Sequence, residues 1–184
     1  MEIITTPFNG ILLIKPDVFS DDRGYFFESF HYQKFLENQL EVNFLQDNVS
    51  KSRKGTIRGL HYQNGSRAQG KLCHVLCGKV FDVALDLRIG SPTFGKHFFT
   101  ELSEENHLQL WIPVGFAHGF SVQSDEAIFK YKCTNYYSKE HERTILFNDP
   151  KLNIDWKVEK PVISKKDLHG KTFDESKSDF YFTF

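Results

Sequence analysis

One segment near the middle of the chain restricts the possible folds more than any other. In KVFDVALDLR, residues 79–88, one set of alternate side chains is wholly apolar. This set is Phe81, Val83, Leu85 and Leu87, and the intervening set is Asp82, Ala84, Asp86 and Arg88. Successive side chains of a β-strand point to opposite faces, so this period of two predicts a strand. We expect one face of it to be apolar and the other to carry polar groups.

Other segments extend this β-pattern over most of the sequence. Further strand candidates are GILLIKP, GYFFESF, KHFFTEL, QLWIP, GFSVQS and AIFKYKCTNYY, separated by turn-rich pieces such as SDDRG, RIGSPTFG and PVGFAHG. The best helix candidate is SFHYQKFLENQL, with Ser29 as its N-cap and Tyr32, Phe35, Leu36 and Leu40 at helical spacing. We therefore expect an all-β fold, an antiparallel β-sandwich or jelly roll with a few short helices and a site at its open mouth.

Length and charge limit the classes of function. A chain of 184 residues suits one domain spanning residues 1–184, and a formal net charge of -1 argues against a nucleic-acid-binding protein. The N-terminal MEIITTPFNG lacks a signal-peptide pattern and no apolar run could span a membrane, so we expect a cytoplasmic protein. Cys73, Cys77 and Cys133 lack metal or redox spacing, and we assign them no role.

The segment RGLHYQNGSRAQGK, Arg58 to Lys71, concentrates cationic and proton-transferring side chains among small residues. In a regular strand, Arg58 and His61 would point to opposite faces. Either Gly59 introduces a bulge or the two side chains serve different walls of one pocket. Lys71 follows a turn-rich connection that returns toward the sheet. A histidine and a lysine brought to one cavity would supply a base and a cation.

At this point the sequence resembles a known family, the dTDP-4-dehydrorhamnose 3,5-epimerases, which are cupin-type jelly rolls. The resemblance rests on seven segments in the family's order: DDRGYFFESF, LQDNVSKSRKGTIRGLHYQ, AQGKL, GKVFDVALDLRIGSPTFGK, QLWIPVGFAHGF, YKCTNYYSKEHE and LFNDPKLNIDW. It implies a cofactor-free isomerase that converts dTDP-4-dehydro-6-deoxy-D-glucose to dTDP-4-dehydro-L-rhamnose, on the pathway to rhamnose-containing polysaccharide.

The same resemblance assigns four catalytic residues. Inversion next to a ketone needs a base, a partner for the enolate oxygen and an acid on the opposite face. By resemblance His61 is the base, Asp167 is its carboxylate partner and Tyr131 is the opposed proton donor. Lys71 is the natural partner of the enolate oxygen. Each of these residue types is also common without a catalytic role. The catalytic assignment therefore depends on the match of all four positions to the family's motifs.

The resemblance also implies a set of substrate contacts and a homodimer. Arg23 and Arg58 match phosphate-binding arginines, and Tyr137 matches an aromatic residue that stacks on thymine. Further substrate contacts are implied for Glu28, Gln46, Asp47, Asn48, His118, Glu142 and Lys166. In the family the N-terminal strands cross a two-fold dimer, so Arg23 and Glu28 are expected to serve the other protomer. Without a partner, Arg23 would be a turn arginine paired to Asp21 or Asp22.

We expect no metal, because HYQ supplies a histidine and a glutamine where metal-binding cupins carry a closely spaced histidine pair. A metal-dependent oxygenase is therefore disfavoured. Two alternatives remain open from the sequence. One is an epimerase that inverts a single carbon of a related keto-sugar nucleotide, and the other is a non-catalytic jelly roll that binds sugar nucleotides.

Overall fold

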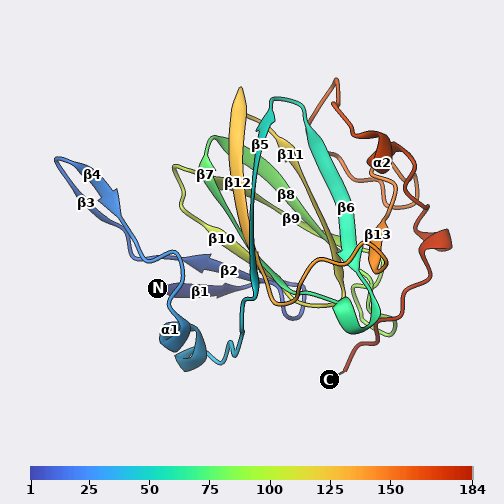
Figure 1. Ribbon diagram of the computed structural model, residues 1–184, viewed down its shortest axis with the longest axis horizontal. Helices are drawn as coiled ribbons and strands as arrows, with labels where there is room; N and C mark the ends of the chain where they lie inside the picture. Colours follow the sequence, from blue (N-terminus) through green and yellow to red (C-terminus); the bar gives the residue numbers. More distant parts are fainter. Residues whose placement is uncertain (184) are drawn as a thin grey trace.

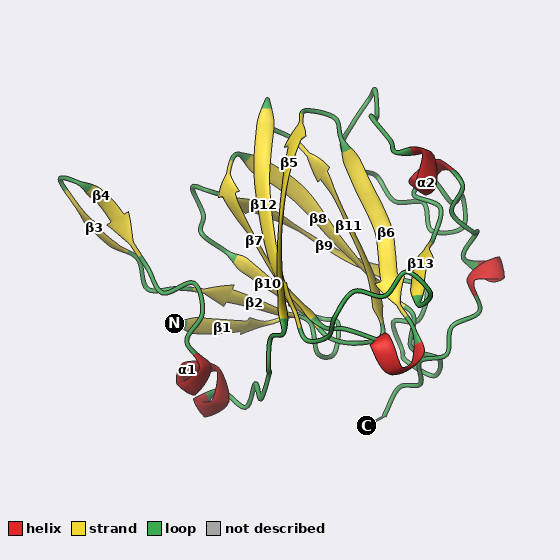
Figure 2. Ribbon diagram, viewed as in Figure 1, coloured by secondary structure: helices red, strands yellow, loops and turns green. Residues whose placement is uncertain are grey.

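The computed structural model describes residues 1–183 as two facing antiparallel β-sheets with a projecting hairpin (Figure 1, Figure 2). The six-stranded sheet has the order β1 (Glu2–Thr5), β2 (Leu12–Lys15), β10 (Gln109–Ile112), β7 (Lys71–Cys77), β12 (Glu126–Cys133) and β5 (Gln46–Arg53). The five-stranded sheet has the order β13 (Glu142–Thr144), β6 (Ile57–Gln63), β11 (Phe116–Val122), β8 (Lys79–Asp86) and β9 (His97–Ser103). This confirms the predicted jelly-roll sandwich.

The main core lies between the two sheets. Val75 and Phe129 from the six-stranded sheet pack against Val80, Ala84 and Phe120 from the five-stranded sheet, and all five are buried. The rings of Phe120 and Phe129 stack with centroids 4.2 Å apart, which joins the sheets directly. Burying a side chain of this size stabilises the fold by about 1.5–3 kcal/mol. The core therefore fixes the spacing of the sheets at whose edge the cavity opens.

A second core covers the outer face of the five-stranded sheet. Val83 and Leu85 of β8 pack there with Ile145, Trp156 and Phe173 from the C-terminal part of the chain. Three isolated parallel bridges attach that part to the sheet, Thr56 with Val162, Ile145 with Lys171 and Ile89 with Tyr181. Both faces of β8 are consequently enclosed, and its polar face points into the protein interior.

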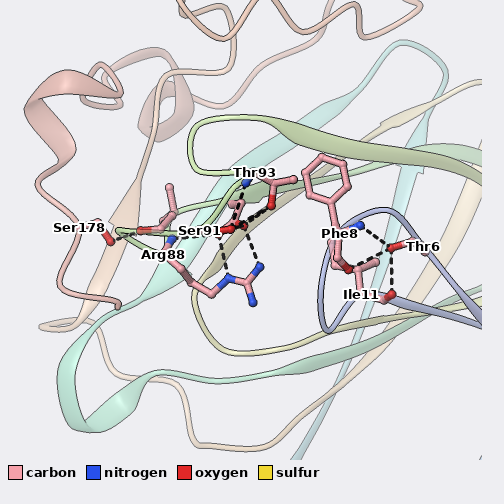
Figure 3. Close-up of polar contacts among 9 residues, drawn as sticks. Thr6, Phe8, Ile11, Arg88, Ser91, Thr93 and Ser178 are labelled. Atoms are coloured by element: carbon pink, nitrogen blue, oxygen red, sulfur yellow. Dashed lines mark hydrogen bonds and ion pairs between the residues drawn. The ribbon is translucent and has the colours of Figure 1, made fainter. Parts of the chain in front are cut away.

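Asp86, on that polar face, is fully buried and held by three side chains. Figure 3 shows Arg88, Ser91 and Thr93, whose donors lie 2.7–2.9 Å from the Asp86 carboxylate. Burial would raise the pKa of Asp86, but these hydrogen bonds hold it below its usual value. The Arg88 guanidinium also lies over the rings of Phe116 and Phe182, at 4.4 and 5.0 Å. The cluster anchors the aromatic C-terminal tail.

The predicted helix forms, but it starts later than expected. Helix α1 spans Tyr32–Glu37, and His31 caps it by accepting a hydrogen bond from the Lys34 amide through Nδ1 at 3.4 Å. Ser29 is not the cap, because its carbonyl accepts a hydrogen bond from Gln109 Nε2 and holds the chain against β10. Phe35 is buried as predicted, whereas Tyr32 is 47% exposed. A second helix, α2, spans Lys165–Leu168.

Two strands differ from the sequence prediction in ways that matter for the site. Strand β5 was not predicted, because QDNVSKSR contains one apolar residue, yet it pairs along its whole length with β12. Strand β11 begins at Phe116, inside the segment predicted as a turn, and so His118 lies in a strand. Both strands are stabilised by their neighbours in the sheet rather than by their own pattern.

The hairpin of β3 (Phe19–Asp21) and β4 (Gly24–Phe26) projects from the sandwich (Figure 1). Phe19 and Phe26 are 65% and 67% exposed, although each is large and apolar. The predicted turn SDDRG forms its tip, and Arg23 there is paired to Asp21. No helix within residues 1–183 is long and apolar enough to cross a membrane.

Candidate active site

A cavity of about 250 Å³ lies between the two sheets. Strands β6 and β11 supply one wall, and β5, β7 and β12 of the other sheet supply the opposite wall. Its lining residues are Ser50, Arg58, His61, Tyr62, Gln63, Gln69, Lys71, His118, Phe120, Tyr131, Tyr137, Glu142 and Lys166. Eight of the predicted site residues lie in this list.

A bulge in β6 brings Arg58 and His61 to the same cavity. His61 pairs with His118 and Arg58 pairs with Phe120, so the register between β6 and β11 shifts around Gly59. Gly59 has φ of +136°, and a Cβ there would lie 2.5 Å from the Gly119 Cα. Only glycine fits this close approach. Of the two arrangements that the sequence left open, the bulge is the one observed.

His61 is oriented by a buried carboxylate. Its Nε2 lies 2.6 Å from Asp167 Oδ1, and the second carboxylate oxygen lies 3.5 Å from the Gly59 amide. Ser164 caps α2 by accepting a hydrogen bond from the Asp167 amide, which fixes the residue at this place. Burial would raise the pKa of Asp167, but the hydrogen bond and charge of His61 lower it below its usual value. An ionised carboxylate here favours the His61 tautomer that carries its proton on Nε2 and donates it in this hydrogen bond, and in that tautomer Nδ1 is the nitrogen that can accept a proton.

Tyr131 and Lys71 lie on the wall opposite His61. Tyr131 belongs to β12 and Lys71 to β7, both in the six-stranded sheet, whereas His61 belongs to the five-stranded sheet. Burial raises the pKa of Tyr131 to about 12, so its phenol keeps its proton at neutral pH. Burial also lowers the pKa of Lys71, whose Nζ lies 3.4 Å from the His61 carbonyl and 5.6 Å from the Tyr131 ring centroid. The Lys71 side chain thus lies between His61 and Tyr131.

His118 forms a second pair with a carboxylate that the sequence analysis did not identify as a site residue. Its Nε2 lies 3.0 and 3.1 Å from the two oxygens of Asp82, on the neighbouring strand β8. Burial lowers the pKa of His118, partly offset by the charge and hydrogen bond of Asp82. Cys73 Sγ lies 3.8 Å from the same nitrogen. The sequence did contain one indication of this pair, because Asp82 lies between apolar neighbours on a strand that is buried on both faces. A buried aspartate is rarely without a hydrogen-bond partner.

Polar side chains surround the outer part of the cavity near Tyr137, which is 54% exposed. The Tyr137 hydroxyl donates to Glu142 Oε2 at 3.2 Å, and Lys166 Nζ donates to Glu142 Oε1 at 2.7 Å. Gln46 accepts a hydrogen bond from the Tyr137 amide and donates one to Asn48. An exposed aromatic ring held in place by its neighbours is suited to stacking on a flat base.

Arg58 is the arginine of the cavity lining, and its Nε donates to Ser52 Oγ at 3.0 Å. The guanidinium keeps further N–H groups for an anion. Ser50, two residues before Ser52 on β5, also lines the cavity, and its buried Oγ makes no hydrogen bond within the described residues. Ser50, Gln63 and Gln69 were not predicted, since a polar residue on a strand is unremarkable in sequence.

Six of the fourteen predicted residues are not in the cavity lining. Asp167, Gln46 and Asn48 are hydrogen-bonded beside it, as described above, whereas the other three lie elsewhere. Arg23 is paired to Asp21 on the projecting hairpin, with Nη2 2.5 Å from Oδ2. Glu28 is paired to Lys34 of α1. Asp47 is on β5 but is paired to Lys132 at 2.8 Å on the sheet surface. A single chain therefore does not bring these three to the residues around His61.

Comparisons with known proteins agree with one another. The sequence model of the dTDP-4-dehydrorhamnose 3,5-epimerase family matches residues 5–175. A dTDP-4-dehydrorhamnose 3,5-epimerase from Shigella flexneri is 54% identical over 175 residues, covering 94% of this chain and 96% of the relative. The structure of a dTDP-6-deoxy-D-glucose-3,5-epimerase from Legionella pneumophila Philadelphia 1, in complex with dTDP-4-keto-L-rhamnose, has a TM-score of 0.94 at 46% identity, covering 100% of this chain and 99% of its own.

A more distant structure is also similar. It is a 3′-monoepimerase from Streptomyces bikiniensis in complex with dTDP-quinovose, with a TM-score of 0.84 at 30% identity, covering 91% of this chain and 85% of its own. The family match and the high identity both extend over nearly the whole chain. The chain therefore belongs to the dTDP-4-dehydrorhamnose 3,5-epimerase family of isomerases.

Proposed function

We propose that this isomerase inverts C5 and C3 of dTDP-4-dehydro-6-deoxy-D-glucose with His61 as the base and Tyr131 as the opposed acid. The 3,5-epimerisation itself is the activity of the family to which the chain belongs. The assignment of base and acid is supported by one observation: His61 and Tyr131 lie on facing sheets and line the same cavity. A sugar ring between them would lose a proton to one wall and gain one from the other.

His61 is suited to the first step by its pairing. Asp167 holds the Nε2 proton, so Nδ1 accepts the proton from the carbon next to the ketone, and the carboxylate then stabilises the imidazolium. Tyr131 is suited to the second step, because its raised pKa keeps the phenol protonated until the enolate needs a proton. Each such general acid or base contributes typically about 10²–10⁴ in rate.

Lys71 would stabilise the negative charge that develops on the ketone oxygen. It is 8% exposed and lies between the His61 carbonyl and the Tyr131 ring. An ammonium in such a dry site interacts more strongly with a developing oxyanion than it would in water. Removal of one oxyanion donor costs about 10²–10³ in rate in other enzymes.

The outer part of the cavity would hold the nucleotide. Arg58 would bind the diphosphate, and Tyr137 would stack on thymine while Gln46 and Glu142 hold the ring. Asn48, Lys166 and His118 would contribute further polar contacts, with His118 deepest because it is buried with Asp82. Asp47 would do so only after leaving Lys132, to which it is paired outside the cavity.

Arg23 and Glu28 would serve the cavity of a second copy. The hairpin that carries Arg23 projects from the sandwich and exposes Phe19 and Phe26, which a partner would cover (Figure 1). A homodimer with exchanged hairpins would add an arginine to the anion-binding part of each cavity. The enzyme would work in the cytoplasm.

A mixing experiment tests the exchange. Arg23→Ala and His61→Asn variants, each of low activity, are unfolded, mixed and refolded together. A mixed dimer would place the intact Arg23 in the cavity that keeps His61, so activity should rise above the sum of the two variants. A mixture no more active than its components would count against shared sites, as would a fully active wild-type monomer in analytical ultracentrifugation.

Incubation with the substrate in deuterium oxide tests the reaction. Deuterium at both C3 and C5, located by NMR after reduction of the product to the rhamnosyl nucleotide, is the expected result. Label at C3 alone would support single-carbon inversion, an alternative that is favoured only by the similarity to the 3′-monoepimerase. Absence of deuterium at both carbons would contradict both epimerase activities, and the remaining alternative would be a non-catalytic protein that binds sugar nucleotides.

A further inference from the structure

Three potential metal ligands meet beneath the catalytic cavity. Cys73 of β7, Asp82 of β8 and His118 of β11 each offer one ligand atom, and these atoms all lie within 4.8 Å of one another. Cys73 and Asp82 are 0% exposed and His118 is 5% exposed. Within residues 1–183 this is the one group of three or more such side chains placed closely enough to hold an ion. None of the proposed catalytic steps uses Cys73.

The distances suit a small ion with tetrahedral geometry. Zinc bonds of about 2.3 Å to sulfur and 2.0–2.1 Å to nitrogen or oxygen, at tetrahedral angles, place sulfur and nitrogen about 3.6 Å apart and nitrogen and oxygen about 3.3 Å apart. The Cys73 Sγ to His118 Nε2 distance is 3.8 Å, and the His118 Nε2 to Asp82 Oδ1 distance is 3.0 Å. Small side-chain movements would therefore convert this hydrogen-bonded group into a set of ligands.

The chemistry of the three groups favours a borderline or soft divalent ion. A thiolate, an imidazole and a carboxylate are all zinc ligands, whereas magnesium and calcium prefer oxygen. Burial, with Asp82 beside it, raises the pKa of the Cys73 thiol well above its usual value, so the thiol carries a proton that an incoming ion must displace. The buried Lys71 ammonium opposes the ion, and the charges of Asp82 and the thiolate offset this repulsion.

Access to the group is through the cavity. His118 both lines the cavity and lies against Cys73 and Asp82, so an ion entering from the cavity would meet the imidazole first. Three protein ligands leave the fourth tetrahedral position open toward the cavity for water. The three ligands come from both sheets, since β7 belongs to one and β8 and β11 to the other.

We propose that Cys73, Asp82 and His118 form an inhibitory site for one zinc-like divalent ion at the base of the catalytic cavity. Binding forms bonds from the ion to Sγ, Nε2 and a carboxylate oxygen. The thiol proton leaves to solvent, and the imidazole proton moves from Nε2 to Nδ1. The ion removes the Asp82 hydrogen bond of His118 and places a dication next to Lys71. The binding part stands on the geometry alone, and the inhibition part rests on the proposed function.

Metal titration of the full chain tests the binding part. The protein is washed with chelator, kept reduced with a phosphine, and titrated with cobalt(II) alone and with zinc alone. We expect about one ion per chain, a thiolate-to-cobalt charge-transfer band in the near ultraviolet, and a rise in Tm because the ion links the two sheets. Absence of the thiolate band up to millimolar cobalt would overturn the proposal.

Two cysteine variants make the test specific. Cys73→Val keeps a small apolar side chain in the core and should lose the cobalt band and at least about 100-fold in zinc affinity, since loss of a supporting partner alone costs 10–100-fold at metal sites. Cys77→Val, the matched control, removes a thiol that lies outside the group and should bind like the wild type. Equal binding by Cys73→Val and wild type would overturn the site. Far-ultraviolet circular dichroism and metal-free activity confirm that both variants fold.

Activity assays then test the inhibition part. Zinc should inhibit deuterium exchange by the wild type and by Cys77→Val, chelator should reverse the inhibition, and Cys73→Val should keep its activity at the same zinc concentration. Binding by the wild type without inhibition would refute the inhibitory role and leave the site itself standing. Failure of the proposed catalytic function would be seen separately, as absence of exchange in the metal-free wild type.

Discussion

Two histidines lie side by side in the five-stranded sheet, each paired with an aspartate, and the two pairs differ in exposure. His61 and His118 are direct partners across β6 and β11, and each places Nε2 against a carboxylate. The His61 side chain is 27% exposed and its partner Asp167 is 3% exposed, whereas His118 and Asp82 are 6% and 0% exposed. The first carboxylate comes from the C-terminal helix α2, and the second comes from the adjacent strand β8.

The difference shows how one sheet supplies two kinds of histidine. His61 is accessible enough to take a proton from a ligand, while a carboxylate from outside the sheet fixes its orientation. His118 is enclosed, and burial lowers its pKa, which favours a neutral imidazole that positions a ligand. In the mechanism that we propose, accessibility, rather than the presence of a carboxylate, separates the catalytic histidine from the positioning histidine.

Substitution of His61 should have the largest effect. His61→Asn removes the base, and we expect deuterium exchange at both C3 and C5 to fall by about 10²–10⁴. His118→Asn is the comparison, and it should mainly raise KM while exchange at saturating substrate is affected less. Exchange rates from NMR decide between them. If the two variants lost exchange equally, the distinction between the two pairs would be wrong.

Substitution of Tyr131 should separate exchange from inversion. Tyr131→Phe keeps the ring that packs near Phe129 but removes the proton donor. Because the base is intact, deuterium should still enter the substrate, and the yield of inverted product should fall by about 10² or more. NMR of the recovered sugar shows both quantities at once. Loss of exchange together with inversion would instead indicate that Tyr131 is needed for proton removal.

Replacement of the carboxylate behind His61 should have a smaller effect than loss of the base. Asp167→Asn can accept one hydrogen bond but cannot stabilise the imidazolium, so we expect kcat to fall by about 10–10³ with little change in KM. The steady-state parameters provide the measurement. If kcat were unchanged and kcat/KM fell by a factor of about 10–10³ instead, Asp167 would contribute to substrate binding.

Substitution in the pair of His118 and Asp82 should change KM rather than kcat. Asp82→Asn should raise KM by about tenfold and lower the free energy of unfolding by about 1–3 kcal/mol, because a buried group loses its charged partner. Asp86→Asn is the matched control, since Asp86 is equally buried on the same strand but bonds Arg88 outside the cavity. It should lose stability with KM unchanged. A raised KM in both variants would mean that the KM effect follows general loosening of β8.

The fold could be predicted where the alternation of apolar and polar side chains within a segment determines its structure. It could not be predicted where contacts with other strands determine it. The pattern of KVFDVALDLR predicted β8 correctly, and a bulge at Gly59, one of the two arrangements that the sequence left open, is present in the structure. Strand β5 could not be recognised, because its stability comes from pairing with β12 rather than from alternation of its own side chains. Ser29 was wrongly chosen as the helix cap, because its carbonyl is used by Gln109 of another strand.

The site was predictable only where a motif carried it. Resemblance to the family placed His61, Lys71, His118 and Tyr131, and these four line one cavity. Two of the residues that were missed are distinguished by burial: Asp82 is buried against His118, and Ser50 has a buried hydroxyl in the cavity lining. Burial and contacts of this kind are not visible in a single sequence. The roles of Arg23 and Glu28 stay predictions, because they depend on a second copy of the chain.

The smallest expected effect concerns the dependence of stability on pH. The pKa of Asp167 is lower in the folded protein than its ordinary value of about 3.9, so ionised Asp167 stabilises the folded state above about pH 4. This contribution is lost as the pH falls through the lowered pKa, because the carboxyl group is then protonated in both states. The difference in unfolding free energy between wild type and Asp167→Asn should therefore shrink from pH 5 to pH 2. Urea unfolding at several pH values measures this difference in unfolding free energy, and Asp155→Asn is the control for an exposed carboxylate. A difference that stayed constant over this range would mean that Asp167 gains nothing from its charge on folding, and its hydrogen bond to His61 would then be positional alone.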